Sequence, residues 1–454
     1  MTTFLGKRRF FITFIVSIQI VGMIQVLIGA ATSGSGKTTF TMGLLRSLAR
    51  RGLKVQPFKC GPDYIDTQFH SIAAGRESVN LDTWMASPEH IREVYARYSA
   101  DADVAVIEGV MGLFDGYDRM RGSSAEIAAL LDVPVVLVVN ARSSAYTAAA
   151  ILHGMKTFRT DVRIAGVVFN QVASESHYAF LREAAADAGV ECLGWIPRTE
   201  GIEVPSRHLG LTIGMEQEIS ALADRVADLI DHNVELGTIP FSTCETLQSS
   251  PTSAFGKGDS PQFHIAIAKD RAFNFVYREN LDRLVQMGEV KYFSPLAGDE
   301  LPDADLVYLP GGYPELFAPE LAMNRMLASQ LVQYTEKGGR IFAECGGMMY
   351  LGKSLTDQDG KVWPMAGVLP IECTMQGAHL HLGYRSMEVN GKVFKGHEFH
   401  YSKCEKGDSP QFHIFSVQNV KKGTVPNSTF RYKNVIAGYT HWYWGENDIL
   451  DFWK

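Results

Sequence analysis

Residues 29 to 40, GAATSGSGKTTF, combine glycines with a lysine and hydroxyl side chains, as phosphate-binding loops do. The apolar run IQVLIGA precedes this stretch, and FTMGLLRSLARRG, with apolar residues at helical spacing, follows it. In such a loop, backbone N–H groups hold phosphates, the lysine reaches the β and γ oxygens, and a hydroxyl binds Mg²⁺. Ala31 stands where the strict pattern has glycine, so the loop is a variant. We predict an ATP site formed by Gly34, Ser35, Gly36, Lys37, Thr38 and Thr39.

Carboxylates follow the next two predicted strands. Asp63 and Asp66 come after LKVQPFKC, while Glu108 ends ADVAVIE and Asp115 lies shortly beyond it. Ligands of open α/β sheets collect at the carboxyl ends of the strands, so we predict that Asp63 and Glu108 join Thr38 around Mg²⁺. Asp66 and Asp115 fit a role as turn formers equally well.

Asn140 and Asn170 end two further predicted strands, VPVVLVVNA and RIAGVVFNQV. A side-chain amide at either place could read an adenine edge, or it could simply close the strand in a turn. Both interpretations stay open, and the two strands complete a parallel sheet.

The stretch RIFAECGGMMYLG, residues 340 to 352, predicts a strand, a sharp turn and a helix, with Cys345 at the turn. Amide groups at a helix N-terminus lower the pKa of a thiol and favour the reactive thiolate. Gly346 and Gly347 allow the backbone to turn tightly and a substrate to approach. We therefore predict that Cys345 is a nucleophile.

A nucleophilic thiol needs a base, and three histidines are candidates: His397 and His400 in GHEFHYS, and His441 in AGYTHWYWG. The residues alone do not rank them, but His441 follows a strand-like segment late in the chain, where a closing catalytic loop would lie. For the oxyanion hole we predict the backbone N–H groups of Gly312, in PGGYPE, and Gly346.

The composition is that of an ordinary globular protein, with 46% apolar and 20% charged residues, and 454 residues favour two hydrophobic cores. A net charge of −7 without a basic block argues against a nucleic-acid surface. The six cysteines form no CxxC pair or regular spacing, which indicates neither a zinc site nor a disulfide scaffold. A reducing cytoplasm fits this pattern best.

Residues 237–262 lose periodicity and are rich in Ser, Thr, Gly and Pro, which is typical of a linker. We predict an α/β protein with two domains: a P-loop domain with a parallel sheet at residues 24–236 and a second α/β domain at 263–454. The first domain contains the glycine-rich loop, and the second contains the turn at Cys345. The string KGDSPQFHI occurs in front of two strand-like runs, at residues 257–265 and 406–414.

The first 23 residues place three basic residues before the apolar run FFITFIVSIQIVGM, which imitates a signal peptide or membrane anchor. Ser17 and Gln19 interrupt the run, and no small-residue cleavage site follows. We predict an apolar N-terminal extension on a cytoplasmic protein rather than a membrane span.

Several motifs together resemble the cobyrinate a,c-diamide synthase family of corrin biosynthesis, from about residue 25 to the end: SGSGKTT, KCGPDYIDTQFH, EGVMGLFDG, AFNFVYRENL, LPGGYPELFA, ECGGMMYLG, GHEFHYS and AGYTHW. The resemblance implies an ATP-binding domain similar to dethiobiotin synthetase, joined to a class I glutamine amidotransferase-like domain. It also implies amidation of the a and c side-chain carboxylates of cobyrinic acid, with ATP, Mg²⁺ and glutamine.

By residue match, the resemblance assigns the family nucleophile to Cys345 and the activating histidine to His441. It assigns the loop on the tetrapyrrole side to Asp63, Tyr64 and Asp66. GHEFHYS is a family signature as well, but it does not supply the assigned base.

The two sites suit one reaction, because a carboxylate reacts with ammonia only after activation. Transfer of the γ-phosphoryl group of ATP would give an acyl phosphate, and ammonia released from glutamine would displace the phosphate. We expect ATP, glutamine and a tetrapyrrole as partners, no nucleic acid and no membrane, and leave a homodimer open.

Rival interpretations remain. Cobyric acid synthase amidates other corrin carboxylates, and the same chemistry would serve nickel-sirohydrochlorin or hydrogenobyrinic acid. A rival of another class is a P-loop switch ATPase with a binding-only C-terminal domain. That class typically has an additional lysine early in the loop, and GAATSGSGK has none.

Overall fold

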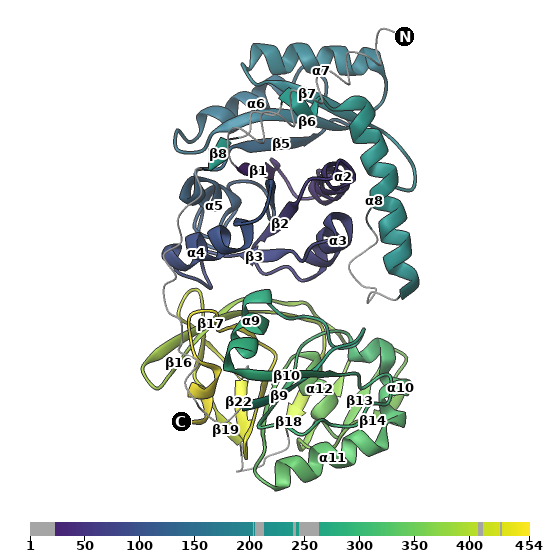
Figure 1. The fold of residues 1–454 in the computed structure, drawn as a ribbon, viewed down its shortest axis with the longest axis vertical. Helices are drawn as coiled ribbons and strands as arrows, with labels where there is room; N and C mark the ends of the chain where they lie inside the picture. The colour runs from purple at the N-terminus through teal and green to yellow at the C-terminus, as the bar shows by residue number, and fades with distance from the viewer. Residues whose placement is uncertain are drawn as a thin grey trace. The chain divides into compact units, whose positions relative to one another are not determined.

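The computed structural model describes residues 23–202, 204, 213–238, 242–244, 263–406, 412–426 and 429–454. The chain forms two compact units, and the boundary between them lies after residue 252 (Figure 1). Apart from Met23, the N-terminal extension lies outside the described residues, as does most of the stretch at 237–262.

The first unit is built on one sheet with the order β3-β2-β4-β1-β5-β6-β7, in which all neighbours are parallel. A short strand, β8, pairs antiparallel with the beginning of β1 and lies inside the stretch predicted as a linker. The strands are β1 (Met23–Gly29), β2 (Val55–Cys60), β3 (Val79–Leu81), β4 (Val104–Glu108), β5 (Val135–Asn140), β6 (Ile164–Val172), β7 (Cys192–Pro197) and β8 (Ser242–Cys244).

Helices cover both faces of this sheet. Figure 1 shows α2, α3 and α8 on one side and α4 and α5 on the other. The helices are α2 (Lys37–Arg50), α3 (Ile65–Ala74), α4 (Pro88–Ser99), α5 (Ser124–Leu131), α6 (Ala148–Thr157), α7 (Glu175–Asp187) and α8 (Ile213–Asn233). Covered on both faces, β2 and β4 are buried along their whole length, and this includes the polar side chains of Gln56 and Lys59 in β2 and of Glu108 at the end of β4.

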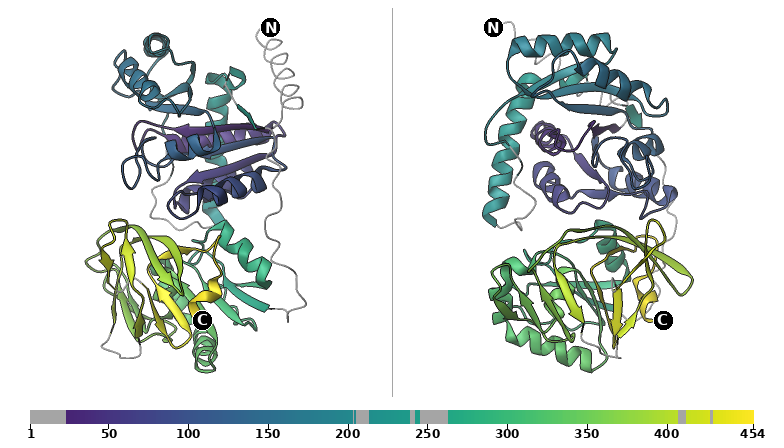
Figure 2. Two further views of the ribbon diagram at one scale, coloured as in Figure 1. Left: turned by 90° about the vertical axis from the view of Figure 1, so that its left-hand side faces the viewer. Right: turned by 180° about the vertical axis from the view of Figure 1, so that it is seen from behind.

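Helices α2 and α8 lie side by side in Figure 1 and in the reverse view of Figure 2. Gly43 permits this approach, because a Cβ atom there would lie 2.5 Å from Cγ1 of Val226. At the rim, Arg50 pairs with Asp224 and Asp228 of α8 at 2.8 Å. The contact fixes α2, the helix that begins directly after the phosphate-binding loop.

The second unit is built on a seven-stranded sheet with the order β10-β9-β11-β12-β23-β22-β19. Its first five strands are parallel, and β22 and β19 continue it antiparallel. Alternate residues of β11 enter two different cores: Val307 and Leu309 face one, Leu306 and Tyr308 the other. The strands are β9 (Phe263–Ala268), β10 (Gly288–Phe293), β11 (Leu306–Leu309), β12 (Arg340–Glu344), β19 (Phe412–Ile414), β22 (Thr429–Tyr432) and β23 (Val435–Gly438).

Two smaller sheets and several helices pack around this one. One sheet has the order β14-β13-β15-β18 and the other β21-β20-β16-β17-β24. Their strands are β13 (Ser354–Thr356), β14 (Val362–Pro364), β15 (Ile371–Thr374), β16 (His381–Val389), β17 (Lys392–His400), β18 (Lys403–Lys406), β20 (Val417–Asn419), β21 (Thr424–Val425) and β24 (His441–Tyr443). The helical segments are α9 (Arg278–Met287), η2 (Pro314–Phe317), α10 (Ala318–Met323), α11 (Arg325–Glu336), α12 (Gly346–Leu351) and η3 (Ile449–Trp453).

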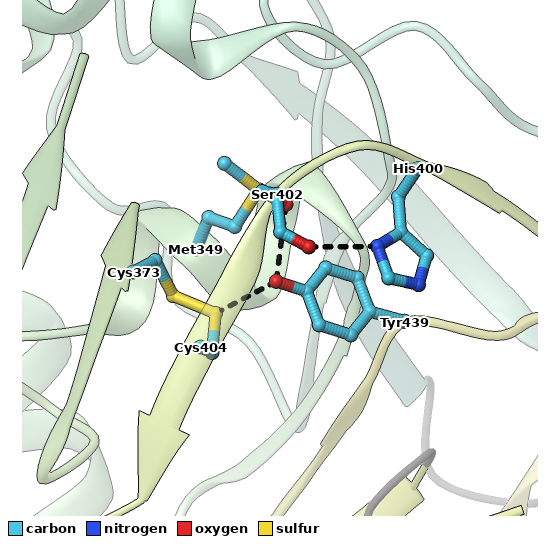
Figure 3. Close-up of a disulfide and its surroundings, with 6 residues drawn as sticks. All are labelled: Met349, Cys373, His400, Ser402, Cys404 and Tyr439. Atoms are coloured by element: carbon cyan, nitrogen blue, oxygen red, sulfur yellow. Dashed lines mark hydrogen bonds between the residues drawn. A yellow bond between two sulfur atoms is a disulfide. The ribbon is translucent and has the colours of Figure 1, made fainter. Parts of the chain in front are cut away.

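The α/β prediction is confirmed in both units, and both copies of KGDSPQFHI run into a strand, β9 and β19. The cysteine spacing indicated no disulfide scaffold, and the one bridge among the residues that the structure describes was not foreseen. Cys373 and Cys404 face each other across the antiparallel pair β15 and β18 and form a disulfide (Figure 3). Their separation of 31 residues gave no local signal, because only the register of two distant strands brings them together.

Replacing both bridged cysteines, Cys373→Ser with Cys404→Ser, is predicted to destabilise the second unit by about 3 kcal/mol, since the cross-link restricts the unfolded chain. The measurement is denaturant unfolding without reductant, compared with the parent protein before and after treatment with a dithiol. Peptide mapping supplies the control: in the unreduced parent, the two cysteine peptides should be found linked. Free, alkylatable thiols at both positions would show that the bridge does not form.

Candidate functional site

The phosphate-binding loop connects β1 to α2, as its sequence predicts. Gly34 and Gly36 have φ angles of +75° and +95°, in the left-handed region that favours glycine. A Cβ atom on Gly36 would also lie 2.0 Å from Nδ2 of Asn170, so the position has no room for a side chain. The hydroxyl of Ser35 donates to the carbonyl of Thr32 at 2.8 Å and closes the turn.

The first residues of α2 point their side chains at the end of β4. Lys37 is buried, and its ammonium donates to the carbonyl of Met111 at 2.6 Å. The hydroxyl of Thr38 donates to Oε1 of Glu108 at 2.7 Å and lies 3.4 Å from Oδ2 of Asp66. Lys37 and Thr38 thus both lie at the carboxyl end of β4, and this is the edge of the sheet at which the sequence predicts a phosphate and its cation.

A buried lysine that the sequence analysis missed completes this cluster. Lys59, at the end of β2, lies 2.7 Å from Oδ2 of Asp66 and 2.8 Å from Oε1 of Glu108. On its other side Glu108 contacts the ring of His70 at 2.5 Å. These side chains are all at most 5% exposed. The only signal in the sequence was a charged residue within the strand VQPFKC, because a buried lysine needs a charged partner, but the strand did not indicate which residue that partner is.

Lys59 and the two carboxyl groups of the cluster stabilise one another's ionised forms. Burial opposes the ionised forms, but Asp66 and Glu108 hold the pKa of Lys59 above its ordinary value. Burial raises the pKa of Asp66 to about 6, with Asp63 adding to the rise and Lys59 opposing it. The pKa of Glu108 is low, because Lys59 and His70 outweigh the burial of its carboxylate. A positive charge therefore lies between two carboxylates beside the hydroxyl of Thr38.

The residues around the start of α3 are arranged differently from the prediction in one respect. The carboxylate of Asp66 contacts Thr38 and Lys59, whereas Oδ1 of Asp63 accepts the backbone N–H groups of Ile65 and Asp66 at 2.9 Å. Asp63 thus supports the first turn of α3 from the residue before its N-cap, Tyr64. Tyr64 follows it and is buried.

Three polar residues at loop and strand ends take structural roles. Asp115 accepts the backbone N–H of Gly112 at 3.0 Å and forms a turn. The amide of Asn170 donates to the carbonyl of Ser35 at 3.0 Å, so it holds the phosphate-binding loop. Asn140 accepts the backbone N–H of Arg142 at 2.9 Å.

A cavity of about 510 Å³ joins these features. Both asparagines, Asp66 and Glu108 line it, but Asp63 and Tyr64 are not among its lining residues. The predicted loop residues in its wall are Gly34, Gly36, Lys37, Thr38 and Thr39. The volume of the cavity and the glycine-rich loop in its wall suit a nucleotide.

The second motif forms the predicted strand, sharp turn and helix. Cys345 lies between β12 and α12 with φ +46° and ψ −105°, a strained conformation for a residue with a side chain. Its N–H donates to the carbonyl of Gly438 at 2.7 Å, which ties the turn to the end of β23. A Cβ atom on Gly347 would lie 2.1 Å from the carbonyl oxygen of Leu309, so the turn packs closely on β11.

The two glycines predicted for the oxyanion hole lie side by side. A Cβ atom on Gly346 would lie 3.0 Å from the backbone nitrogen of Gly312. Gly312 has φ +156°, and a Cβ atom there would meet the carbonyl oxygen of Ala272 at 2.1 Å. Neither position has room for a side chain, and the two backbones lie next to each other beside the turn at Cys345.

His441 begins β24, three residues beyond the end of β23. Because β12 and β23 are parallel with Glu344 opposite Gly438, Cys345 and His441 follow strands that end at the same edge of the sheet. The ring of His441 also faces this edge, since a Cβ atom on Gly311 would lie 2.1 Å from its Cε1.

The charge state of this second site corrects the predicted thiolate. Burial raises the pKa of the Cys345 thiol, and Glu315 raises it further, while the N–H of Gly346 lowers it only in part. Burial lowers the pKa of His441 to about 3. At neutral pH the site therefore holds a neutral thiol and a neutral imidazole, so the thiol has to be deprotonated during the reaction.

The two other candidate bases have partners of their own. His400 stacks on Tyr439 with ring centroids 3.6 Å apart, and its Nδ1 contacts the carbonyl of Ser402 at 3.0 Å (Figure 3). Tyr439 in turn donates to Sγ of Cys404 in the disulfide. His397 bonds to Tyr277 through Nδ1 at 2.6 Å.

Comparison with known proteins gives the same division of the chain. Residues 26–211 match the CobQ/CobB/MinD/ParA nucleotide binding domain, and residues 264–449 match the CobB/CobQ-like glutamine amidotransferase domain. A cobyrinate a,c-diamide synthase of Picrophilus torridus is 40% identical over 93% of this chain and 96% of its own. A hydrogenobyrinate a,c-diamide synthase of Brucella anthropi is 39% identical over 94% of this chain and 98% of its own.

The chain belongs to the cobyrinate and hydrogenobyrinate a,c-diamide synthase family. The resemblance inferred from the motifs is therefore confirmed. A further member, a cobyrinate a,c-diamide synthase of Saccharolobus solfataricus, is 37% identical over 92% of this chain and 97% of its own. Within the ranges that the structure describes, no helix is both long and apolar enough to span a bilayer.

Proposed function

We propose that the protein amidates the a and c side-chain carboxylates of a corrin ring, using ATP for activation and glutamine as the nitrogen source. The observation that carries this proposal is the presence of two complete motifs in one chain: a phosphate-binding loop facing carboxylates, and a cysteine at a strained turn beside glycine amides. Family membership supplies the class of substrate.

In the first step, the substrate carboxylate attacks the γ-phosphorus of ATP, ADP leaves, and an acyl phosphate forms. Charge develops on the phosphoryl oxygens, and Lys37 at the start of α2 is placed to neutralise it. Lys59 is a second cation within the same cavity. We propose that Lys59 holds Asp66 and Glu108 in place and faces the transferred group.

The residues around Thr38 fit Mg²⁺. Their donors are a hydroxyl and two carboxylates, which are the oxygen ligands this cation prefers. In the structure the ammonium of Lys59 lies between the same two carboxylates, so the arrangement already accommodates a positive charge. We propose that Thr38, Asp66 and Glu108 hold the ion, directly or through water, and that it neutralises charge on the β and γ phosphates.

In the second step, glutamine provides ammonia. His441 takes the proton of the Cys345 thiol as the sulfur attacks the side-chain carbonyl of glutamine. The N–H groups of Gly312 and Gly346 receive the oxyanion, and His441 passes the proton to the departing nitrogen. Water then releases glutamate from the thioester. Ammonia attacks the acyl phosphate, phosphate leaves, and the amide is formed.

The relatives leave one alternative about the ring. Two are named for cobyrinate and one for hydrogenobyrinate, which have the same carboxylates on rings with and without cobalt. We propose cobyrinic acid as the substrate and hydrogenobyrinic acid as the alternative, while Asp63 and Tyr64 stay predictions for the loop on the tetrapyrrole side.

The test of this function is the mass of the product formed from cobyrinic acid with ATP, Mg²⁺ and glutamine. We expect two conversions of carboxylate to amide. Lys37→Ala should abolish them with either nitrogen source, because the acyl phosphate no longer forms. Cys345→Ala should abolish them with glutamine but not with ammonium. Glutamine-dependent product from Cys345→Ala at the parental rate would disprove the assigned nucleophile.

Asp66 and Asp63 form a matched pair for testing the cation site. Asp66→Asn is predicted to weaken the apparent Mg²⁺ affinity in ATP turnover by at least about 10-fold, since it removes one charged oxygen ligand. Asp63→Asn retains a side-chain oxygen that can accept the N–H groups of the first turn of α3, and it should leave that affinity within about twofold. The measurement is a Mg²⁺ titration of ATP turnover in each variant. A larger loss of Mg²⁺ affinity in Asp63→Asn than in Asp66→Asn would contradict this proposal. It would support the ligands predicted from the sequence, which are Thr38, Asp63 and Glu108.

A further inference from the structure

We propose that His397, anchored by Tyr277, is the positioning residue that orients the ring of His441 for glutamine hydrolysis. This inference rests on the proposed function, because it concerns the base of the same glutaminase site. A cysteine nucleophile needs a base whose ring is itself held in one orientation by a third group. In other enzymes that group is commonly a carboxylate or an amide.

The contact between the two histidines follows from strand register. His397 on β17 and His441 on β24 face each other directly across an antiparallel pair. Their rings stack, with centroids 5.2 Å apart and planes inclined by 21°. The backbone of Gly311 limits the edge of the His441 ring at Cε1, while His397 covers one of its faces. Rotation of the His441 ring away from this plane would break the stack.

Tyr277 in turn holds His397. Its hydroxyl and Nδ1 of His397 form a hydrogen bond of 2.6 Å. Tyr277 lies at the beginning of α9 and is 1% exposed, and it also packs edge-on against Tyr443 at 5.5 Å. The anchor is therefore buried and held on two sides, and it comes from the residue directly before α9, outside the sheet that holds the two histidines.

Two buried carboxyl groups near His441 fix its backbone through the neighbouring residues, and burial raises the pKa of one of them, Glu344, to about 8. Oε1 of Glu344 accepts the N–H of Trp442 at 2.7 Å, and its Oε2 accepts the hydroxyl of Tyr308 at 2.7 Å. Glu398 accepts the hydroxyl of Thr440 at 2.7 Å. The two carboxyl groups hold the residues before and after His441, and the imidazole ring itself stacks on His397.

A neutral ring at position 397 suits this role. Burial lowers the pKa of His397 well below its ordinary value, and the neighbouring His441 and Arg385 lower it further. When His441 accepts the thiol proton, its positive charge therefore faces the π surface of an uncharged ring. That contact is attractive, whereas a second imidazolium would repel it.

The experiment compares glutamate release by Tyr277→Phe, His397→Ala and His397→Phe with that of the parent enzyme. His397→Ala should lower kcat by about 100-fold, the low end of what a general base contributes, with KM for glutamine within about twofold. His397→Phe restores a stacking ring and should recover at least about 10-fold of that loss. Tyr277→Phe should lower kcat by about 10-fold, and the rate at which iodoacetamide alkylates Cys345 should fall in parallel.

Two controls separate this inference from the proposed function. His381→Ala removes an exposed histidine from β16 in the same sheet and should match the parent. Each variant should also keep parental activity with ammonium in place of glutamine, which reports that the fold is intact. If His397→Ala loses the activity with ammonium, its fold is damaged, and Tyr277→Phe and His397→Phe then test the inference.

The inference is overturned if Tyr277→Phe keeps the parental kcat and alkylation rate, or if the variants raise KM while kcat is unchanged. It is also overturned if His397→Phe is no better than a folded His397→Ala. The proposed function fails by a different result: a parent enzyme that releases no glutamate, or a Cys345→Ala variant that still does.

Discussion

Both sites depend on one constraint, the register of parallel strands that end at a common edge of a sheet. In the first unit Glu108 lies opposite Ile28, so the phosphate-binding loop begins beside the carboxylate that its threonine contacts. In the second unit Glu344 lies opposite Gly438, so the turn at Cys345 is bonded to the segment that leads to His441. Each chemical group comes from a segment distant in sequence, and the hydrogen bonds of the sheet set its position.

The two sites use burial in opposite ways. Around Thr38, buried groups are charged and paired, because an ammonium lies between two carboxylates and each stabilises the ionised form of the other. Around Cys345, burial raises the pKa of the thiol and lowers that of His441, so both groups are neutral at rest. The first site is prepared for a highly charged nucleotide. At the second site, charges form only when a proton moves from Cys345 to His441. The rate of glutamine hydrolysis then depends on the glycine amides and on the orientation of the His441 ring.

Local motifs in the sequence predicted much of this arrangement. The loop at Gly36, the turn at Cys345 and the order of strand and helix around them depend on nearby residues, and the structure places them as expected. What the sequence could not reveal depends on pairing between distant strands: the disulfide between Cys373 and Cys404, the contact of Lys59 with Glu108, and the stacking of His397 on His441. The predicted thiolate at Cys345 was wrong for a related reason, since burial and nearby carboxyls outweigh the helix amides and are set by tertiary packing.

The central claim is that the substrate carboxylate is activated at the nucleotide site, and that the ammonia released at Cys345 becomes the nitrogen of the new amide. The most direct measurement is the isotopic composition of the product made from cobyrinic acid, ATP and glutamine labelled with ¹⁵N only in its side-chain amide. The account predicts ¹⁵N in both new amide groups. A product whose new amides contain no ¹⁵N, or ATP turnover with labelled glutamine that leaves the corrin unchanged, would contradict it.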